Sequence, residues 1–227
     1  AIPTELGSMS DLLLDFVLAS NKFSSSLPTE LGQMSKLTYG FRAEFNELSS
    51  SIPTELGRHS HLNGRLALKS NLLSLAIPTE VGNFVRIRSN LELGSNQLGL
   101  KEEASKQPAV PTQLGRLSQL VDGLSLGPNS LNSFLPTELG LLTEMDGALF
   151  MASSLLYRSI PTELGTLTRL ESLELSDNSL RSVIPTQLAQ LSCSSTWPGY
   201  VDLSFNNLCG DVPTELGYMT EQELISK

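Results

Sequence analysis

The chain has 227 residues, of which 40% are hydrophobic and only 6% aromatic, so a buried core must consist mainly of leucine, isoleucine and valine. The formal net charge of −9 repels a phosphate backbone, which argues against nucleic acid as a partner. No apolar run reaches the roughly 18 residues that a membrane-spanning helix needs, because Asp15 interrupts the stretch LLLDFVL at 12–18.

One hexapeptide, with small variations, occurs nine times along the chain. It reads IPTELG at 2–7, 52–57 and 160–165, and variants begin at residues 27, 77, 110, 135, 184 and 212. Self-similarity at a period of 20 to 50 residues is typical of solenoids and propellers. We therefore expect one repeat domain over 1–227, with about eight full repeats and a truncated ninth at 212–227. Because the chain opens inside this IPTELG phrase, we expect a mature or excised piece of a longer protein.

The copy at 160–183 shows what each repeat should build. Leu173 and Leu175 alternate with Glu174, which predicts a short strand with both leucines pointing inward and Glu174 pointing outward. Pro161 and Gly165 predict a compact helical or irregular turn, because proline fixes φ and removes a donor and glycine permits a tight exit. Coils of this kind bury their leucines only when they stack, and the stacked strands then form one parallel sheet.

An asparagine follows the predicted strand in most repeats. There its amide can satisfy backbone groups that leave the ladder in adjacent coils. Ser154 takes this place in the sixth repeat, where we expect a weaker corner; the asparagines are Asn21, Asn46, Asn71, Asn96, Asn129, Asn178 and Asn206.

Together, the L-x-L strand, the asparagine and the I-P-x-x-L-G turn resemble the repeats of plant-type leucine-rich repeat proteins, over essentially the whole chain. Such proteins include receptor-like protein and kinase ectodomains and polygalacturonase-inhibiting proteins. The resemblance implies an α/β solenoid with one parallel β-sheet on its concave face and short helical, 3-10 or irregular turns on its convex face. It also implies a non-enzymatic recognition module, extracellular or at the cell surface, that binds a protein, peptide or oligosaccharide on the concave sheet.

Two departures from the family pattern affect local structure. Six repeats have one extra residue before the strand, often near a glycine such as Gly40, Gly64, Gly123 or Gly147, which predicts a bulge. The consensus glycine four residues after the asparagine is kept only at Gly210, which makes a regular second strand on that flank doubtful.

The outward residues of the predicted sheet differ from repeat to repeat. The second and third repeats offer basic residues and the later ones acidic residues, so we expect a polarised ligand-binding face; its candidates are Arg42, Glu44, Arg65, Lys69, Glu92, Phe150, Glu174 and Asp202.

The IPTELG phrases could instead form a functional convex surface. Their threonines should stack at the strand spacing of about 4.8 Å, beside glutamates in seven of the nine phrases. This leaves a structural or surface-active protein as an alternative, with ice or divalent cations bound by the Thr and Glu ladders.

Catalytic and metal signals in the sequence are weak. Ser125 lies in GLSLG, but we expect it in the middle of a strand rather than on a nucleophile elbow. His59 and His61 have only Glu55 nearby as a further ligand, so we expect half-buried packing at His59 and solvent exposure at His61. We therefore expect no enzyme activity, no metal and no cofactor.

Insertions break the period near 99–109 and 193–200. The second contains Trp197 and Tyr200, which we expect as loop contacts to a ligand. Cys193 and Cys209 form either one disulfide or two free thiols. Neither end has a clear capping segment, so end-to-end self-association is a further expectation.

Overall fold

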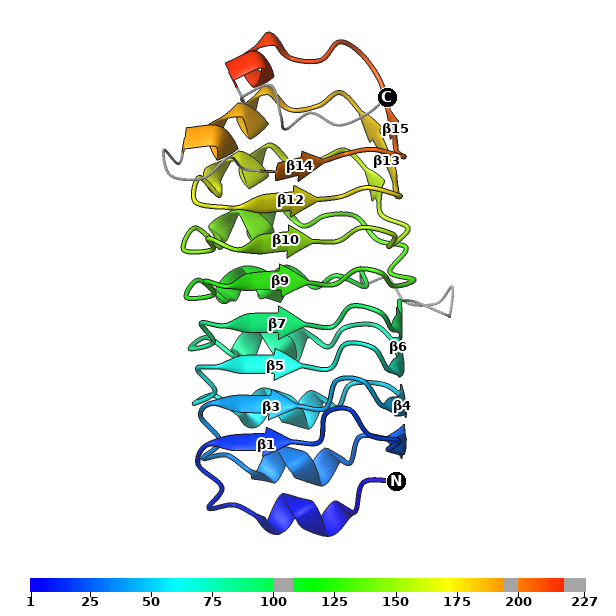
Figure 1. Cartoon of the computed structure of the whole chain (residues 1–227), viewed down its shortest axis with the longest axis vertical. Coiled ribbons are helices and arrows are strands. Elements are labelled where there is room, and N and C mark those ends of the chain that lie inside the picture. Colours follow the sequence, from blue (N-terminus) through cyan, green and yellow to red (C-terminus); the bar gives the residue numbers. More distant parts are fainter. Residues whose placement is uncertain (100–107, 194–199, 219–227) are drawn as a thin grey trace.

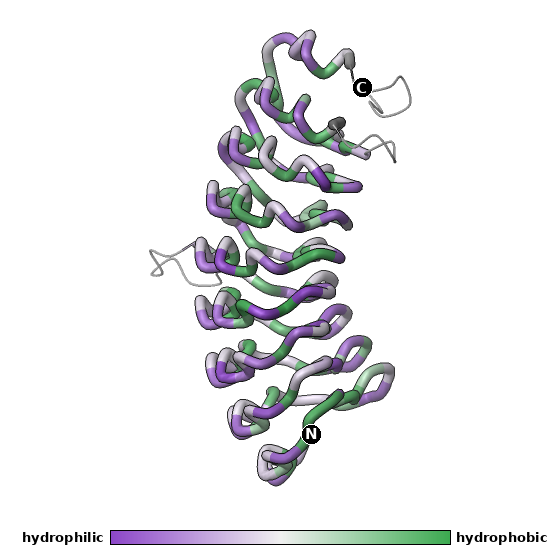
Figure 2. The backbone as a smooth tube through the Cα atoms, turned by 90° about the vertical axis from the view of Figure 1, so that its left-hand side faces the viewer, coloured by the Kyte–Doolittle hydropathy of each residue, from purple (hydrophilic) through white to green (hydrophobic). Residues whose placement is uncertain are grey.

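The chain winds into an elongated stack of coils (Figure 1). The computed structural model describes residues 1–99, 108–193 and 200–218, except for the side chains of residues 192, 193 and 218. Seen from the side, the coils lie one above another, and hydrophobic and hydrophilic stretches alternate around each of them (Figure 2). The insertions expected near 99–109 and 193–200 fall largely outside the described residues.

One parallel sheet of eight strands runs along the stack, as the L-x-L pattern predicts. Each strand has three residues, and the middle one, for example Leu173, is buried in the core. In the order of the sheet, which is also the order of the chain, the strands are β1 (Asp15–Val17), β3 (Gly40–Arg42), β5 (Arg65–Ala67), β7 (Asn90–Glu92), β9 (Gly123–Ser125), β10 (Ala148–Phe150), β12 (Ser172–Glu174) and β14 (Tyr200–Asp202).

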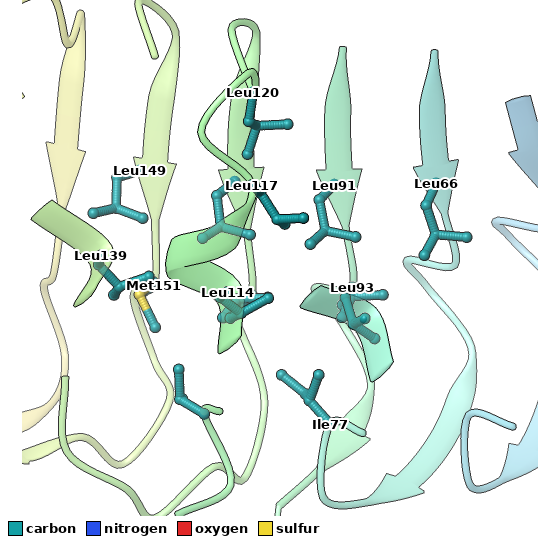
Figure 3. Close-up of a cluster of buried hydrophobic side chains, with 14 of the residues drawn as sticks. Leu66, Ile77, Leu91, Leu93, Leu114, Leu117, Leu120, Leu139, Leu149 and Met151 are labelled. Atoms are coloured by element: carbon teal, nitrogen blue, oxygen red, sulfur yellow. The ribbon is translucent and has the colours of Figure 1, made fainter. Parts of the chain in front are cut away.

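The core lies between this sheet and the turns formed by the IPTELG phrases. Figure 3 shows Leu91 and Leu149 from the strands pointing into the same space as Leu114 and Leu139 from the turns. The buried hydrophobic residues form one cluster that extends from Ile2 to Leu216. Each coil therefore depends on its neighbours for burial, which is how solenoids are stabilised.

Each phrase folds into one short 3-10 helix. The preceding proline, for example Pro28 with φ −64° and ψ 136°, stands at the N-cap in extended conformation. The threonine hydroxyl makes no capping hydrogen bond at Thr29; it donates to the Glu30 carboxylate at 3.4 Å. The helices are η1 (Thr4–Ser8), η2 (Thr29–Gln33), η3 (Thr54–Arg58), η4 (Thr79–Asn83), η5 (Thr112–Arg116), η6 (Thr137–Leu141), η7 (Thr162–Thr166), η8 (Thr186–Cys193) and η9 (Thr214–Tyr218).

The glycine of the phrase allows neighbouring 3-10 helices to approach closely. A Cβ atom on Gly32 would lie 2.3 Å from the backbone oxygen of Glu55 in the next coil. The φ of Gly32 lies outside the left-handed region, so glycine is needed here for space. The expectation that glycine serves as a tight exit from its own coil is therefore wrong.

The asparagines join adjacent coils at the corner, as the sequence predicts. The Asn71 Nδ2 donates to the Ala43 carbonyl at 2.9 Å, and its Oδ1 accepts from the Leu48 N–H at 3.0 Å, both in the preceding coil. In the sixth repeat, the Ser154 hydroxyl reaches only the carbonyl of Ala152, in its own coil.

Second strands follow the corner in seven coils, so the expectation of an irregular flank is wrong. They form a four-stranded and a three-stranded parallel sheet. At the position of the consensus glycine, the backbone is left-handed even where another residue stands, with φ of 68° at Ser50 and 72° at Arg158. The strands are β2 (Ser24–Ser26), β4 (Glu47–Ser50), β6 (Leu72–Leu75), β8 (Gln97–Leu98), β11 (Tyr157–Arg158), β13 (Ser179–Ser182) and β15 (Asn207–Leu208).

Paired N–H groups mark the start of several strands of the eight-stranded sheet. The N–H groups of Tyr39 and Gly40 both donate to the Leu14 carbonyl, at 2.9 and 3.4 Å. The same arrangement joins Asn63 and Gly64 to the Thr38 carbonyl. Two residues thus face one, which agrees with the predicted bulges.

Candidate ligand-binding surface

The outward side chains of the eight-stranded sheet, here called the sheet face, include most of the predicted ligand-binding residues. Strand register aligns one residue from each coil in a row across the stack, and five of the candidates belong to this row. The row consists of Val17, Arg42, Ala67, Glu92, Ser125, Phe150, Glu174 and Asp202.

Most basic residues in the N-terminal part of the sheet face are paired with carboxylates. Arg42 pairs with Glu44 at 3.1 Å, and Lys69 pairs with Glu92 of the next coil. Arg65 forms no ion pair with any described residue. The expected basic start is therefore largely compensated by carboxylates on the same surface.

Glu44 is unusual among the charged residues of the sheet face because only 6% of it is exposed. Its Oε1 accepts hydrogen bonds from Nε and Nη2 of Arg42, at 3.3 and 3.1 Å. Its Oε2 is buried and has no hydrogen-bond partner among the described residues.

Apolar side chains that the sequence reading missed surround this charged cluster. Val17 is 50% exposed and is registered beside Arg42. Phe45 is 51% exposed, and the Lys69 Nζ lies 5.8 Å from its ring centroid. The sequence did contain a signal for Phe45. It stands directly before its corner asparagine, at a position that serine holds in other repeats, as at Ser20, Ser70 and Ser95.

The C-terminal part of the sheet face is acidic, as expected. Glu174 and Asp202 are registered side by side on β12 and β14. Burial of the Asp202 carboxyl would raise its pKa, but hydrogen bonds from Ser204, Ser176 and Tyr200 outweigh that effect and hold the pKa below its ordinary value. Partial burial and the Asp202 carboxylate raise the pKa of Tyr200.

Phe150 lies between these two ends, on a part of the sheet face with small side chains. Its registered neighbours are Ser125 and Glu174, and Ala148 and Ala152 lie beside it in the chain. Ser125 lies in a strand, as expected, but it is the last residue of β9 rather than a residue in the middle. The Phe150 side chain is half-buried on this part of the sheet face.

His59 is buried, which corrects the expectation of a half-buried side chain. Its exposed fraction is 1%, its ring stacks on Phe41, and its Nε2 lies 3.0 Å from the Leu31 carbonyl. Burial lowers the pKa of His59, although the hydrogen bond to Leu31 opposes this. His61 is exposed, and no cluster of three or more potential metal ligands occurs in the part of the chain that the structure describes.

The loop candidates at the C-terminal end are only partly visible. Tyr200 is the first residue of β14 rather than a loop residue; it is 38% exposed, and its hydroxyl donates a hydrogen bond to Asp202 Oδ2 at 3.2 Å. Trp197 lies outside the described residues. Cys209 is exposed, and the side chain of Cys193, its predicted partner, is not among those described. The Cys193–Cys209 disulfide therefore stays a prediction.

Two hollows open between phrases of neighbouring coils, and no residue of the eight-stranded sheet lines them. One of about 360 Å³ is lined by Pro78 and Thr79, and another of about 530 Å³ is lined by Phe134 and Arg158. They adjoin the fifth repeat, where the described residues contain no second strand. These two hollows are the alternative binding surface that any binding experiment has to test.

Comparison with known proteins identifies the repeat class. The family model for the Leucine Rich Repeat matches residues 169–191. No curated protein sequence matches the chain. None of the described helices is long and apolar enough to cross a membrane.

The similar solved structures are mostly plant receptors. The plant peptide hormone receptor RGFR1, in complex with RGF2, superposes with a TM-score of 0.83 at 27% identity over 96% of this chain and 32% of its own. The LRR ectodomain of the Arabidopsis thaliana receptor kinase GASSHO1/SCHENGEN3, in complex with CASPARIAN STRIP INTEGRITY FACTOR 2, gives 0.83 at 31% identity over 97% and 24%. The chain thus spans a quarter to a third of these receptors.

A plant ice-binding protein also shares the fold, with a TM-score of 0.57 at 19% identity over 89% of this chain and 74% of its own. That likeness shows the fold alone. The repeat pattern, the parallel sheet with 3-10 turns and the receptor structures agree, and the chain belongs to the plant-type leucine-rich repeat proteins.

Proposed function

We propose that this chain is a non-enzymatic recognition module that docks an extended peptide on its sheet face, outside the cell. The observation that carries the proposal is the contrast between two surfaces. The phrase side repeats nearly the same residues from coil to coil, whereas the side chains of the sheet face change in size and charge along the stack. A surface whose side chains vary along a rigid frame suits recognition, because little ordering is needed on binding.

The receptor structures support the same choice of ligand. RGFR1 is in complex with RGF2, and the Arabidopsis receptor kinase HAESA, 30% identical over 96% of this chain and 34% of its own, is in complex with the peptide hormone IDA. Peptides are also chemically suited to the sheet face, which offers charged pairs at one end, Phe150 in the middle and carboxylates at the other.

The convex ladders support the ice-binding or cation-binding alternative less well. The hydroxyls of Thr54 and Thr79 donate to the glutamates that follow them, at 3.3 and 3.1 Å. A row of hydroxyls engaged with charged carboxylates is a poor match to a flat ice lattice.

A displayed library of random peptides, panned on the intact chain, tests the docking face. Peptides selected in this way should lose about 10-fold or more in affinity for Phe150→Ala, because truncation of a central aromatic anchor removes a large share of binding energy. Thr29→Ala, on the phrase side and away from both hollows, is the matched control and should bind them like the unchanged chain. Equal binding to both variants would place the site elsewhere, with the hollows beside the fifth repeat as the next surface to test.

A further inference from the structure

We infer that the sheet face contains, at the second and third repeats, a subsite for one cationic side chain of the ligand, with the Glu44 carboxylate as its acceptor. This inference rests on the proposed peptide-binding function and names the group that one part of the sheet face selects. The guanidinium of arginine and the ammonium of lysine share the required chemistry, since both are positively charged N–H donors.

The first argument is the unfilled acceptor. Glu44 is 94% buried, being 6% exposed, and Arg42 occupies only its Oε1. Oε2 is buried without a donor among the described residues. Buried polar atoms are nearly always hydrogen-bonded, and an ionised carboxylate is especially costly to leave unsatisfied. Oε2 therefore requires a donor that the described part of the chain does not supply.

The second argument is that the coil does not need a carboxylate at this place. Glu44 stands two residues before its corner asparagine, and small residues hold the equivalent place in six of the other seven coils. These residues are Ala19, Gly94, Gly127, Ala152, Ser176 and Ser204. Lys69 holds the seventh place, and it is engaged by Glu92. Stacking of the coils thus proceeds without a charge here, so Glu44 is an addition to the repeat rather than part of it.

The third argument is the surroundings of Glu44. Val17 and Phe45 are both about half exposed, at 50% and 51%, close to Arg42 and Lys69 respectively. Such apolar surfaces suit the aliphatic stem of arginine or lysine, whose charged end reaches the carboxylate once the groups that cover Oε2 shift. A hydrogen bond between a cation and a carboxylate is roughly twice as strong as a neutral one, which favours a cation over an amide or hydroxyl.

A positional-scanning library of nonapeptides, captured on the immobilised intact chain, tests this subsite. The unchanged chain should enrich arginine or lysine at one position of the captured peptides. Glu44→Gln keeps the acceptor for Arg42 but places an amide N–H₂ group where Oε2 stands, so this enrichment should fall about 10-fold or more. Preferences at the other positions should persist. Glu47→Gln, at an exposed carboxylate on β4 and outside the sheet face, is the control and should keep the preference.

Thermal unfolding of Glu44→Ala separates a ligand acceptor from a structural residue. Alanine already holds this place in the first and sixth repeats, so the unfolding midpoint should stay the same or rise. The subsite is overturned if the cationic preference is missing, if it survives in Glu44→Gln, or if Glu44→Ala lowers the midpoint. Capture of peptides without that preference leaves the proposed function standing, whereas capture of no peptide overturns both.

Discussion

At the scale of single residues, His59 shows how one polar side chain adapts to the leucine core. It stands where Met9, Met34, Phe84 and Leu117 stand in other repeats, and it satisfies its Nε2 with the carbonyl of Leu31. Because that carbonyl can only accept, Nε2 carries the proton and donates. The other ring nitrogen, Nδ1, then has to stay unprotonated, so that the imidazole ring is neutral inside the core.

This leads to a prediction about acid stability. Burial lowers the pKa of His59 in the folded chain, so below pH 6.5, the ordinary histidine value, the unfolded chain binds more protons and stability falls. His59→Met should remove this part of the pH dependence, which amounts to at most about 1.4 kcal/mol per pH unit for one proton. Urea unfolding at pH 7.5 and pH 5 measures it, with the exposed-site variant His61→Gln as control. A pH dependence unchanged in His59→Met would contradict the assignment.

The left-handed residues on the flank give a second prediction at this scale. Ser25, Ser50 and Ser182 have φ of 74°, 68° and 88°, where glycine is less strained. A non-glycine residue in this region costs about 1–2 kcal/mol, part of which the entropy of glycine offsets. The variant carrying glycine at all three positions should therefore be more stable in urea unfolding, by about 1–3 kcal/mol. Ser49→Gly, one residue away and outside the left-handed region, should instead lose about 0.5–1 kcal/mol.

At the scale of elements, the contact between successive 3-10 helices depends on a missing side chain. The Cβ of an alanine at position 32 would lie 2.3 Å from the Glu55 backbone oxygen, which cannot rotate away. We expect Gly32→Ala to destabilise the fold by about 1–3 kcal/mol, as overpacking does. Gly217 has nothing within 4 Å of the equivalent position, so Gly217→Ala should be neutral or slightly stabilising. Equal losses in the two variants would show that the contact is not the cause.

The sequence predicts an element well when the residues that determine it lie within one repeat, and poorly when they lie in a neighbouring coil. Leu173 and Leu175 alternate within a coil, and this alternation predicted the strand and its inward side. The role of Gly32 could not be predicted in the same way. The atom that leaves no space for a side chain at this position is the backbone oxygen of Glu55, which belongs to the next coil. The second strands were missed because Ser50 and its equivalents tolerate a backbone that the consensus assigns to glycine.

The candidate surface was predictable in outline and not in its electrostatics. The residues of the sheet face follow from the strand pattern alone. The Arg42–Glu44 pair could have been found, since residues two apart on a strand share a face. The Lys69–Glu92 pair and the burial of Glu44 depend on neighbouring coils and rotamers, which no repeat pattern contains.

At the scale of the whole molecule, stability is a chain of contacts between nearest neighbours. Asn129 joins the fourth and fifth coils, because its Oδ1 accepts from the Leu98 N–H at 2.8 Å and its Nδ2 donates to the Leu93 carbonyl at 3.0 Å. Asn21, at the end of the stack, donates only to carbonyls of its own coil, at Leu18 and Ala19.

We therefore expect Asn129→Ala to reduce the cooperativity of unfolding more than Asn21→Ala. Loss of the central connection leaves buried backbone groups unsatisfied, which costs about 1–3 kcal/mol, and it separates two blocks that can then unfold independently. Urea unfolding followed by circular dichroism, together with hydrogen exchange in each half, measures this. A single sharp transition of unchanged slope in Asn129→Ala would show that the hydrophobic core alone couples the halves.

The close approach of each phrase glycine to its neighbour also has an evolutionary meaning. Each phrase within the stack contacts the phrase of the preceding coil on one side and that of the following coil on the other. The same six-residue motif therefore forms both sides of every interface between coils. A gene segment encoding 25 residues can therefore be duplicated or lost in frame, and the new boundary resembles those already present. Copy number and ligand specificity can then change separately, the first by recombination of whole units and the second by point substitutions on the strands.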